Sequence, residues 1–186
     1  MSGGPVRCDI VKTILVLTVI SEDRPGLVDK LSKTIVKCDA NWESSRMARL
    51  AGRFAGILLV SVDEERADEL EAALNALTAS ADMSIVVQRS AADEPLPDRN
   101  AFRLQLVGTD RPGIIHEISH VLAARQVNVE DMRSDCEATP MGGGQLFRMT
   151  ATLTCIATTD IDEVCVAIES VANDLMVDIT LDTSAS

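Results

Sequence analysis

The stretch SEDRPGLVDKLS, Ser21–Ser32, returns later in the chain as GTDRPGIIHEIS, Gly108–Ser119. The offset between the two copies stays constant downstream, because three further pairs match: Asn41 with Asn128, Glu43 with Glu130, and Arg46 with Arg133. Such a constant offset is hard to obtain by chance and indicates an internal duplication. The repeated stretch therefore predicts two related domains, and its pattern indicates how each one is built.

A polar segment, RSAADEPLPDRN at Arg89–Asn100, lies between the copies. It holds two prolines and has no apolar periodicity, which is typical of a linker. We expect a first domain at residues 10–90, a linker at 91–99 and a second domain at 100–182. The chain of 186 residues is long enough for two small domains of this size.

The hydrophobic pattern has the same order in each copy. In the first copy the β-branched run KTILVLTV predicts a buried strand before the DRPG turn. After the turn, Leu27, Leu31 and Ile35 recur at helical spacing, and Val28 widens the stripe. Two strands, a second helix and a last strand follow, which gives the order β-α-β-β-α-β twice. This order predicts an α+β fold of the ferredoxin-like type, with helices on one face of an antiparallel sheet.

The second copy follows this plan with a longer hairpin loop, ATPMGGG at residues 138–144. Its second helix carries a candidate N-cap, since Thr159 is followed by Asp162. We expect the buried face of that helix to carry Val164, Ile168 and Val171. The glycines of the loop follow a strand and open no helix, so they do not fit a phosphate-binding loop.

Composition excludes several classes of function. The net charge of −12 repels phosphate backbones and anionic membranes, so we expect no direct nucleic-acid or membrane partner. The apolar run Ile14–Ile20 is too short to span a bilayer, and the N-terminus carries no hydrophobic signal core. We therefore expect a cytoplasmic protein. Five cysteines without a C-x-x-C motif predict reduced thiols: Cys8, Cys38, Cys136, Cys155 and Cys165.

The segment HEISH, His116–His120, matches the H-E-x-x-H pattern of zinc peptidases. The chain has no third histidine, and the matching residues of the first copy are Asp29 and Lys33, which could not form a similar site. The histidines also lie off the apolar stripe of their helix. We therefore predict no metal site, no cofactor, no catalytic residues and no enzymatic activity.

The DRPG turn offers features of an amino-acid site in both copies. Gly26 and Gly113 lack a side chain where the backbone could approach a partner, and the following helix has free N–H groups that attract carboxylate. Its proline suits the first helical turn. Asn41 and Asn128 can offer a carbonyl to an ammonium group and an amide to a carboxylate. Turn chemistry explains the same residues, so a structural interpretation stays open.

At these residues the sequence resembles the ACT domain family. A (G/S)xDRPG(I/L) turn, an apolar helix and an Asn-led strand are similar to that family's ligand-binding corner. The stretch NWESSRMARLAGRFAGILLVS, residues 41–61, and the presence of two such domains resemble the glycine cleavage system transcriptional repressor family. The resemblance covers Lys12 to Leu181.

This resemblance implies a non-enzymatic regulator. ACT domains pair side by side and bind amino acids at the seam, within one chain or in a homodimer, and the repressor family is thought to act through a DNA-binding protein partner. The implied ligand contacts are Asp23, Gly26 and Asn41 in the first copy, and Asp110, Gly113 and Asn128 in the second.

Two departures distinguish the copies, because Ser21 and Trp42 of the first stand where the second has Gly108 and Val129. The added bulk makes the second copy the better candidate for ligand binding. An alternative function is an ACT-type interaction module that binds no ligand and controls an enzyme of amino-acid metabolism.

Overall fold

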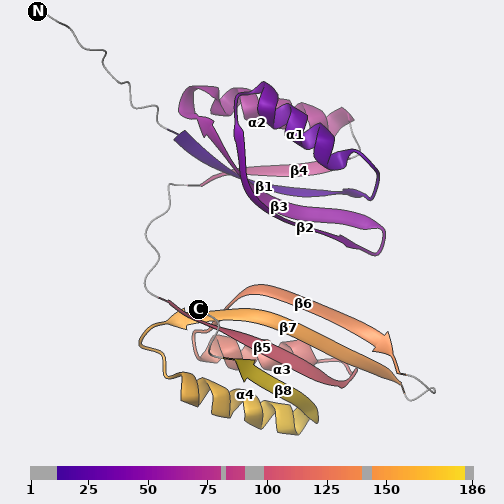
Figure 1. The fold of residues 1–186 in the computed structure, drawn as a ribbon, viewed down its shortest axis with the longest axis vertical. Coiled ribbons are helices and arrows are strands. Elements are labelled where there is room, and N and C mark those ends of the chain that lie inside the picture. Colours follow the sequence, from indigo (N-terminus) through magenta and orange to yellow (C-terminus); the bar gives the residue numbers. More distant parts are fainter. Residues whose placement is uncertain (1–11, 81–82, 91–98, 140–143, 183–186) are drawn as a thin grey trace, which may run out of the picture. The chain divides into compact units, whose positions relative to one another are not determined.

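The computed structural model describes residues 12–80, 83–90, 99–139 and 144–182. The chain divides into two compact units, Met1–Glu94 and Pro95–Ser186 (Figure 1). Most of the expected linker and part of the expected hairpin loop lie outside the described residues.

The first domain has the expected order of elements. They are β1 (Lys12–Glu22), α1 (Leu27–Lys37), β2 (Asn41–Leu50), β3 (Arg53–Asp63), a single 3-10 turn η1 (Glu64–Arg66), α2 (Ala67–Ser80) and β4 (Met83–Ser90). The strands form one sheet in the order β2-β3-β1-β4, and every neighbouring pair is antiparallel. The ferredoxin-like expectation is confirmed for this copy.

The second domain repeats the plan. Its elements are β5 (Arg99–Thr109), α3 (Ile114–Ala124), β6 (Asn128–Ala138), β7 (Gln145–Ile156), α4 (Ile161–Leu175) and β8 (Val177–Asp182). Its sheet order, β6-β7-β5-β8, is equivalent to that of the first domain, and all neighbours are again antiparallel. In both domains the strand that follows the first helix, β2 or β6, is therefore an edge strand.

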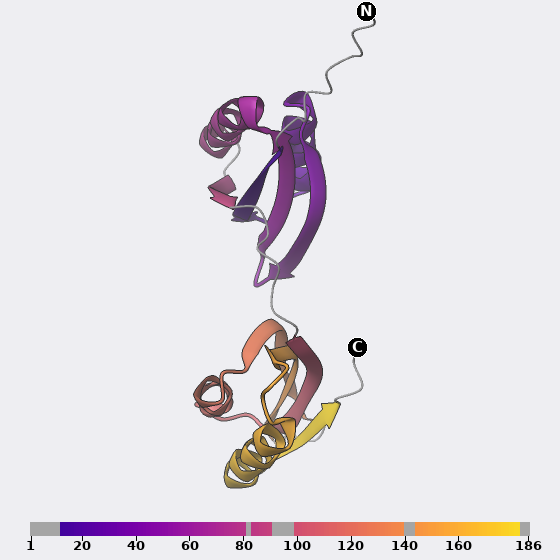
Figure 2. The same cartoon turned by 90° about the vertical axis from the view of Figure 1, so that its left-hand side faces the viewer.

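The core of each domain lies between its sheet and its two helices, which cover one face of the sheet (Figure 2). Alternation along β1 sets this arrangement, because Leu15, Leu17 and Val19 are buried while Thr18 and Ile20, on the opposite face, are exposed. Full burial of one such aliphatic side chain contributes about 1.5–3 kcal/mol to folding. Within the described residues of each domain, no helix covers the opposite face of its sheet.

Helix α4 differs from the sequence prediction in its N-cap residue and in its buried face. Its N-cap is Asp160, whose carboxylate accepts hydrogen bonds from the backbone N–H groups of Asp162 and Glu163 at 3.0 and 3.2 Å. Thr159 is instead part of the preceding turn, in which its N–H donates to the Ile156 carbonyl. The fully buried face ends at Ala172 rather than Val171, which is only partly buried.

Helix α1 corrects a third detail, since its buried stripe is Leu27, Leu31 and Ile35. Val28 was expected to widen this stripe, but 47% of it is exposed. It lies one residue, or about 100°, around the helix from Leu27, and this rotation turns it away from the sheet.

The two differences between the copies near the DRPG turn have a packing explanation. A Cβ atom at Gly108 would approach the Cγ1 atom of Val177 to 2.4 Å, so the neighbouring strand β8 requires a glycine there. Ser21, at the same position of β1, is buried on the core side of the sheet. Trp42 is half-buried and packs against the first core, whereas Val129 is 38% exposed. These differences therefore fit core packing and carry no evidence about ligand access.

Candidate functional site

The DRPG turns end in a glycine with left-handed backbone conformation. Gly26 has φ 90° and Gly113 has φ 102°, and each is the N-cap of the helix that follows, without a side-chain hydrogen bond to the cap. Pro25 and Pro112 lie in the turn before this glycine, so the expectation that they occupy the first helical turn is wrong. Proline cannot adopt a positive φ, and the glycine supplies the reversal that starts the helix.

The space around these glycines is open. A Cβ atom built at Gly26 or Gly113 would meet nothing within 4 Å. Conformation rather than crowding therefore requires glycine at both positions. The carbonyl of Gly26 accepts the N–H of Lys30, and that of Gly113 accepts the N–H of Glu117, each at 3.0 Å. The earlier N–H groups of the first turn have no capping side chain, which leaves a helix start suited to a carboxylate.

The aspartate of each turn is tied to the neighbouring hairpin. The N–H of Asp23 donates to the Gly52 carbonyl at 3.1 Å, and that of Asp110 donates to the Gln145 carbonyl at 2.8 Å. The Asp23 carboxylate also forms an ion pair with Arg49, at 2.6 Å between Oδ2 and Nε. In the first copy this aspartate is therefore already engaged.

An exposed thiol, Cys136, lies beside the second turn. Desolvation raises the pKa of Cys136 most, and the negative charge and hydrogen bond of Asp110 raise it further. This direction keeps the thiol protonated and makes it a poor nucleophile. The four cysteines within the described residues, Cys38, Cys136, Cys155 and Cys165, are all free, while Cys8 lies outside them.

A hollow of about 310 Å³ adjoins the second turn, between the start of α3 and the end of α4. Its lining includes Arg111, Gly113, Glu117 and Asp174. The Arg111 guanidinium donates through Nη2 to the Asp174 carbonyl at 3.3 Å, and its Nε is buried without a hydrogen-bond partner among the described residues. A positive group therefore lies next to the uncapped helix start, which strengthens its attraction for a carboxylate.

The asparagines of the candidate set lie at the starts of β2 and β6. The Asn41 amide donates to Oε1 of Glu43 at 2.9 Å, and the Ser61 hydroxyl donates to the same oxygen at 2.5 Å. These hydrogen bonds lower the pKa of Glu43, and the bond from Ser61 has the larger effect. The side chain of Asn41 is thus partly used within its own strand pair. Asn128 is exposed and lies level with Thr154 of β7.

Within one domain the structure does not bring the turn and the asparagine together. Asn41 is level with Ser61 and, through it, with Ile14, whereas the turn follows Glu22. Eight residues of strand correspond to about 27 Å. The second domain has the same separation, because Asn128 is level with Ala101 and its turn follows Thr109. The two parts of the candidate set therefore occupy opposite ends of each sheet.

The sequence prediction did not include two arginines that lie beside the DRPG turns. Arg111 is part of the repeated DRPG motif, so the repeat itself offered the signal that singles it out. Arg49 lies on β2 opposite Phe54, and only the strand pairing places it near Asp23.

The HEISH histidines lie on the exposed surface of α3, with ring centroids 6.2 Å apart. In α1 the matching residues Asp29 and Lys33 form an ion pair at 2.7 Å. Within the part of the chain that the structure describes, no group of three or more His, Cys, Asp or Glu side chains could hold a metal ion.

Comparison with known proteins fits this architecture. A family model described as an ACT domain matches residues 13–88, which is the first domain. The second domain repeats both its topology and its DRPG turn. The first domain belongs to the ACT domain family. The chain as a whole is a tandem of two ferredoxin-like domains, of which the second resembles the first.

Two curated relatives are similar over part of their length. The glycine cleavage system transcriptional repressors of Escherichia coli (strain K12) and Shigella flexneri are each 29% identical over 120 residues, which are 64% of this chain. The alignment spans 63% of the length of either relative. A solved structure, an unknown protein from Galdieria sulphuraria, is 31% identical with a TM-score of 0.82, over 92% of this chain and 98% of that one. Among the described residues of this protein, no helix is long and apolar enough to cross a membrane.

Proposed function

We propose that this protein is a non-enzymatic regulator that senses an amino acid through its ACT domains. The observation that carries the proposal is the uncapped helix start at Gly113, with open space over the glycine and the Arg111 guanidinium beside it. A free amino acid would direct its carboxylate to these N–H groups. Asp110, Gly113 and Asn128 are the proposed contacts, and Asp23, Gly26 and Asn41 are their counterparts in the first domain.

Pairing of ACT domains along an edge strand would complete such a site. β2 and β6 are edge strands, so each can accept a further strand. A second domain that joins in the antiparallel sense has its own strand reversed. Its asparagine then lies at the level of the first domain's DRPG turn, although the two are far apart within one domain. This geometry makes a ligand site that only paired domains provide.

The second domain is the better candidate for the ligand. In the first domain Asp23 already pairs with Arg49, and Asn41 already donates to Glu43. These internal contacts would have to break before a ligand could use the same groups. They favour, for the first domain, the alternative role of an interaction module without ligand.

The similarity to glycine cleavage system transcriptional repressors supports a role in transcriptional control. We propose that the protein acts there through a protein partner, a DNA-binding regulator, because its net charge of −12 disfavours direct contact with phosphate backbones.

A thermal-shift screen with the common amino acids tests the sensing role. A ligand that binds only the folded state raises the melting temperature as its concentration rises. We expect one amino acid, or a few related ones, to do so. If no amino acid at millimolar concentration shifts the melting temperature, the sensing role fails and the interaction-module function stands instead.

A further inference from the structure

The arginine of the DRPG motif is present in both domains, but it contacts a different group in each. In the first domain Arg24 forms an ion pair with Glu22. In the second domain the residue at the position of Glu22 is Thr109, which has no charge. Arg111 instead donates a hydrogen bond to the backbone carbonyl of Asp174, near the end of α4. The exchange of glutamate for threonine therefore accompanies a change in the partner of the arginine.

Strand register supports this comparison of the two turns. Glu22 lies opposite Arg53 of β3, and Thr109 lies opposite Leu146 of β7. The hydrogen bond and charge of Arg24, and then the charge of Arg53, lower the pKa of Glu22. The first turn thus has a carboxylate that is already paired with guanidinium groups, whereas both matching positions beside the second turn are uncharged.

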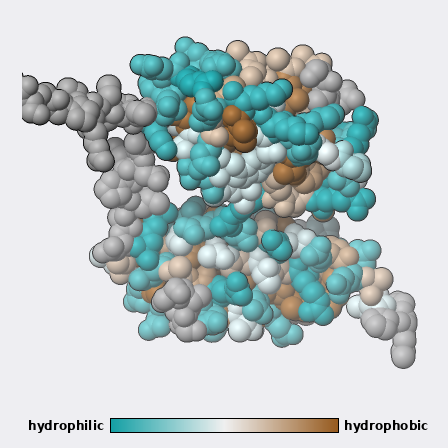
Figure 3. All heavy atoms as spheres, turned by 45° about the horizontal axis from the view of Figure 1, so that its top comes forward, coloured by the Kyte–Doolittle hydropathy of each residue, from teal (hydrophilic) through white to brown (hydrophobic). Residues whose placement is uncertain are grey.

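Arg111 lacks the kind of partner that several other arginines have. Each of Arg49, Arg66, Arg89 and Arg148 forms an ion pair with a carboxylate. Among the residues that the structure describes, no carboxylate forms an ion pair with Arg111. Hydrophilic side chains predominate on the side drawn in Figure 3, and Asp and Glu outnumber Lys and Arg by 29 to 17. On such a surface a guanidinium without a carboxylate partner is available to an anionic ligand.

The hollow at the second turn lies between two helix ends of opposite polarity. Helix α3 begins at Ile114 with partly positive N–H groups, and α4 ends at Leu175 with partly negative carbonyl groups. Besides Arg111, the charged residues of its lining are Glu117 and Asp174. A simple anion would be repelled by these two carboxylates. An amino acid carries both charges, so its carboxylate suits the arginine and its ammonium group suits the acidic side chains.

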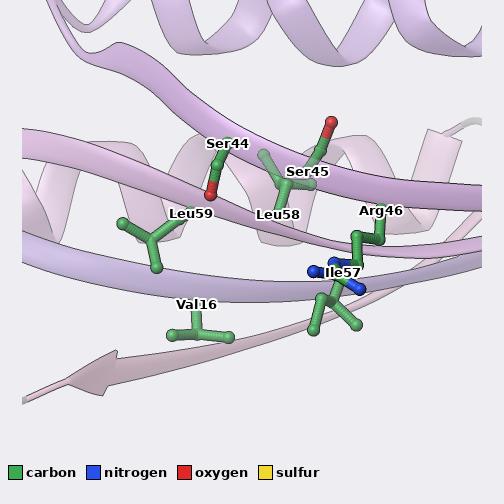
Figure 4. A pocket seen from close by; sticks show the side chains of 7 residues that line it. All are labelled: Val16, Ser44, Ser45, Arg46, Ile57, Leu58 and Leu59. Carbon is green, nitrogen blue, oxygen red and sulfur yellow. The ribbon is translucent and has the colours of Figure 1, made fainter. Parts of the chain in front are cut away.

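Two other hollows fit an amino acid less well. The one on the helix-free face of the first sheet has a volume of about 240 Å³, and Figure 4 shows Val16, Ile57 and Leu59 around it. Arg46 is the charged residue of its lining, which offers no carboxylate to an ammonium group. The hollow on the same face of the second sheet has charges of both signs, but strands alone line it, and it offers no helix N–H groups to a carboxylate.

We infer that Arg111 binds the carboxylate of the amino acid, and that the uncharged Thr109 permits this whereas Glu22 prevents it at the first turn. This inference rests on the proposed sensing role and adds which residues discriminate between the two copies. Both turns share the same backbone geometry, so side chains must decide which of them binds. A carboxylate at the position of Thr109 would pair with Arg111 and compete with the amino acid for its N–H donors.

The test measures binding of the common amino acids to the full chain, by thermal shift and then calorimetry. Thr109 is exposed, so its substitution leaves the core intact. Thr109→Glu should weaken the binding of every amino acid that binds the wild type by roughly tenfold or more, because Arg111 is then already paired. Thr109→Gln adds a side chain of the same size without the charge and should bind almost as the wild type does.

Thr180→Glu is the matched control for the added charge. Thr180 is an exposed threonine of β8 opposite Gln105, which lies about 13 Å along β5 from Thr109. Salt screens charges over this distance, so the control should bind as the wild type does.

Arg111→Gln separates an effect through the arginine from direct repulsion between the new carboxylate and the amino acid. It should weaken binding to a similar extent, and Thr109→Glu added to it should cause little further loss, since both changes act on one group. Losses that multiply would overturn the role of Arg111. So would an Arg111→Gln variant that is less stable in urea but binds normally, because the arginine would then only cap the end of α4.

Failure of this inference differs from failure of the sensing role. If the wild type binds an amino acid and Thr109→Glu binds it equally well, the inference alone is wrong. If the wild type binds no amino acid, the sensing role is wrong and the inference fails with it.

Discussion

Gly26 and Gly113 share one left-handed conformation, although their domains differ in surface chemistry. That conformation starts each helix without a capping side chain and leaves its first N–H groups open. At the residue scale, a carboxylate site therefore depends on backbone geometry more than on any side chain. The polar contacts of the two turns differ, because Asp23 is paired with Arg49 while Asp110 adjoins the Cys136 thiol.

Glu43 gives a pH-dependent prediction at the same scale. Hydrogen bonds from Ser61 and Asn41 hold the pKa of Glu43 below its usual value. A lowered pKa in the folded state stabilises the fold above the unfolded-state pKa, and this stability is lost as pH falls through the folded-state pKa. Ser61→Ala should therefore raise the pKa of Glu43 towards its usual value.

Two measurements check this expectation. An NMR titration of the Glu43 carboxyl group gives the pKa directly, and urea unfolding compares the variant with the wild type. The free energy of unfolding of Ser61→Ala should fall below that of the wild type, and the pH-dependent part of this difference should be largest near neutral pH and shrink as the solution becomes acidic. Ser84→Ala, on the exposed part of β4, is the control. An unchanged Glu43 pKa in Ser61→Ala would show that the serine does not set it.

Helix α4 carries a prediction at the scale of an element. Its N-cap carboxylate, Asp160, satisfies two backbone N–H groups. Asp160→Ala should destabilise the second domain by about 1 kcal/mol, which denaturant unfolding can measure. Asp160→Asn should retain most of that stability, since asparagine is also a good cap. Thr159→Ala should be nearly neutral; a larger loss there than at Asp160 would favour the cap expected from the sequence.

Most elements could be predicted because each depends on local periodicity. The repeat fixed their order, and the apolar stripe Leu27, Leu31 and Ile35 marked the buried face of α1. The cap of α4 was less certain, since Thr159 and Asp160 are adjacent and both residue types can cap a helix. Val28 was predicted to be buried and is exposed, because the apolar pattern alone does not determine how wide the buried stripe of a helix is.

The candidate site was less predictable, because it depends on distances across the sheet. The sequence placed a DRPG turn and an asparagine in each copy, but strand register places them at opposite ends of the sheet. The ion pair between Asp23 and Arg49 likewise arises from the pairing of β2 with β3. Such contacts join residues far apart in the chain and leave no local pattern.

At the scale of the whole molecule, the two copies of a duplicated domain share a fold and differ in surface chemistry. Asp23 of the first copy pairs with Arg49, whereas Asp110 of the second adjoins the Cys136 thiol. On the helix-free face of the sheet, Ile57 and Val86 of the first copy stand where the second has Thr150 and Thr180.

The charge of the whole chain gives a further prediction. With a net charge of −12, the purified protein should not bind DNA by itself at about 150 mM salt, because its 29 Asp and Glu side chains outnumber its 17 Lys and Arg side chains and repel the phosphate backbone. A gel-shift assay at micromolar concentration measures this. A retarded band with the purified chain alone would mean that a basic surface has been overlooked and that no DNA-binding partner is required.

Amino-acid binding at the second DRPG turn is the central claim, and calorimetry with the amino acid found by thermal shift tests it most directly. The variants are Gly113→Asn and Asn128→Ala, with His116→Ala as the control. Asparagine tolerates the left-handed conformation better than other side chains, so Gly113→Asn fills the open space with limited strain. Loss of a desolvated hydrogen bond in Asn128→Ala should weaken binding about ten- to a hundredfold. Both variants should lose most binding while they stay folded, and His116→Ala should bind normally; wild-type affinity in both would show that the turn is not the ligand site.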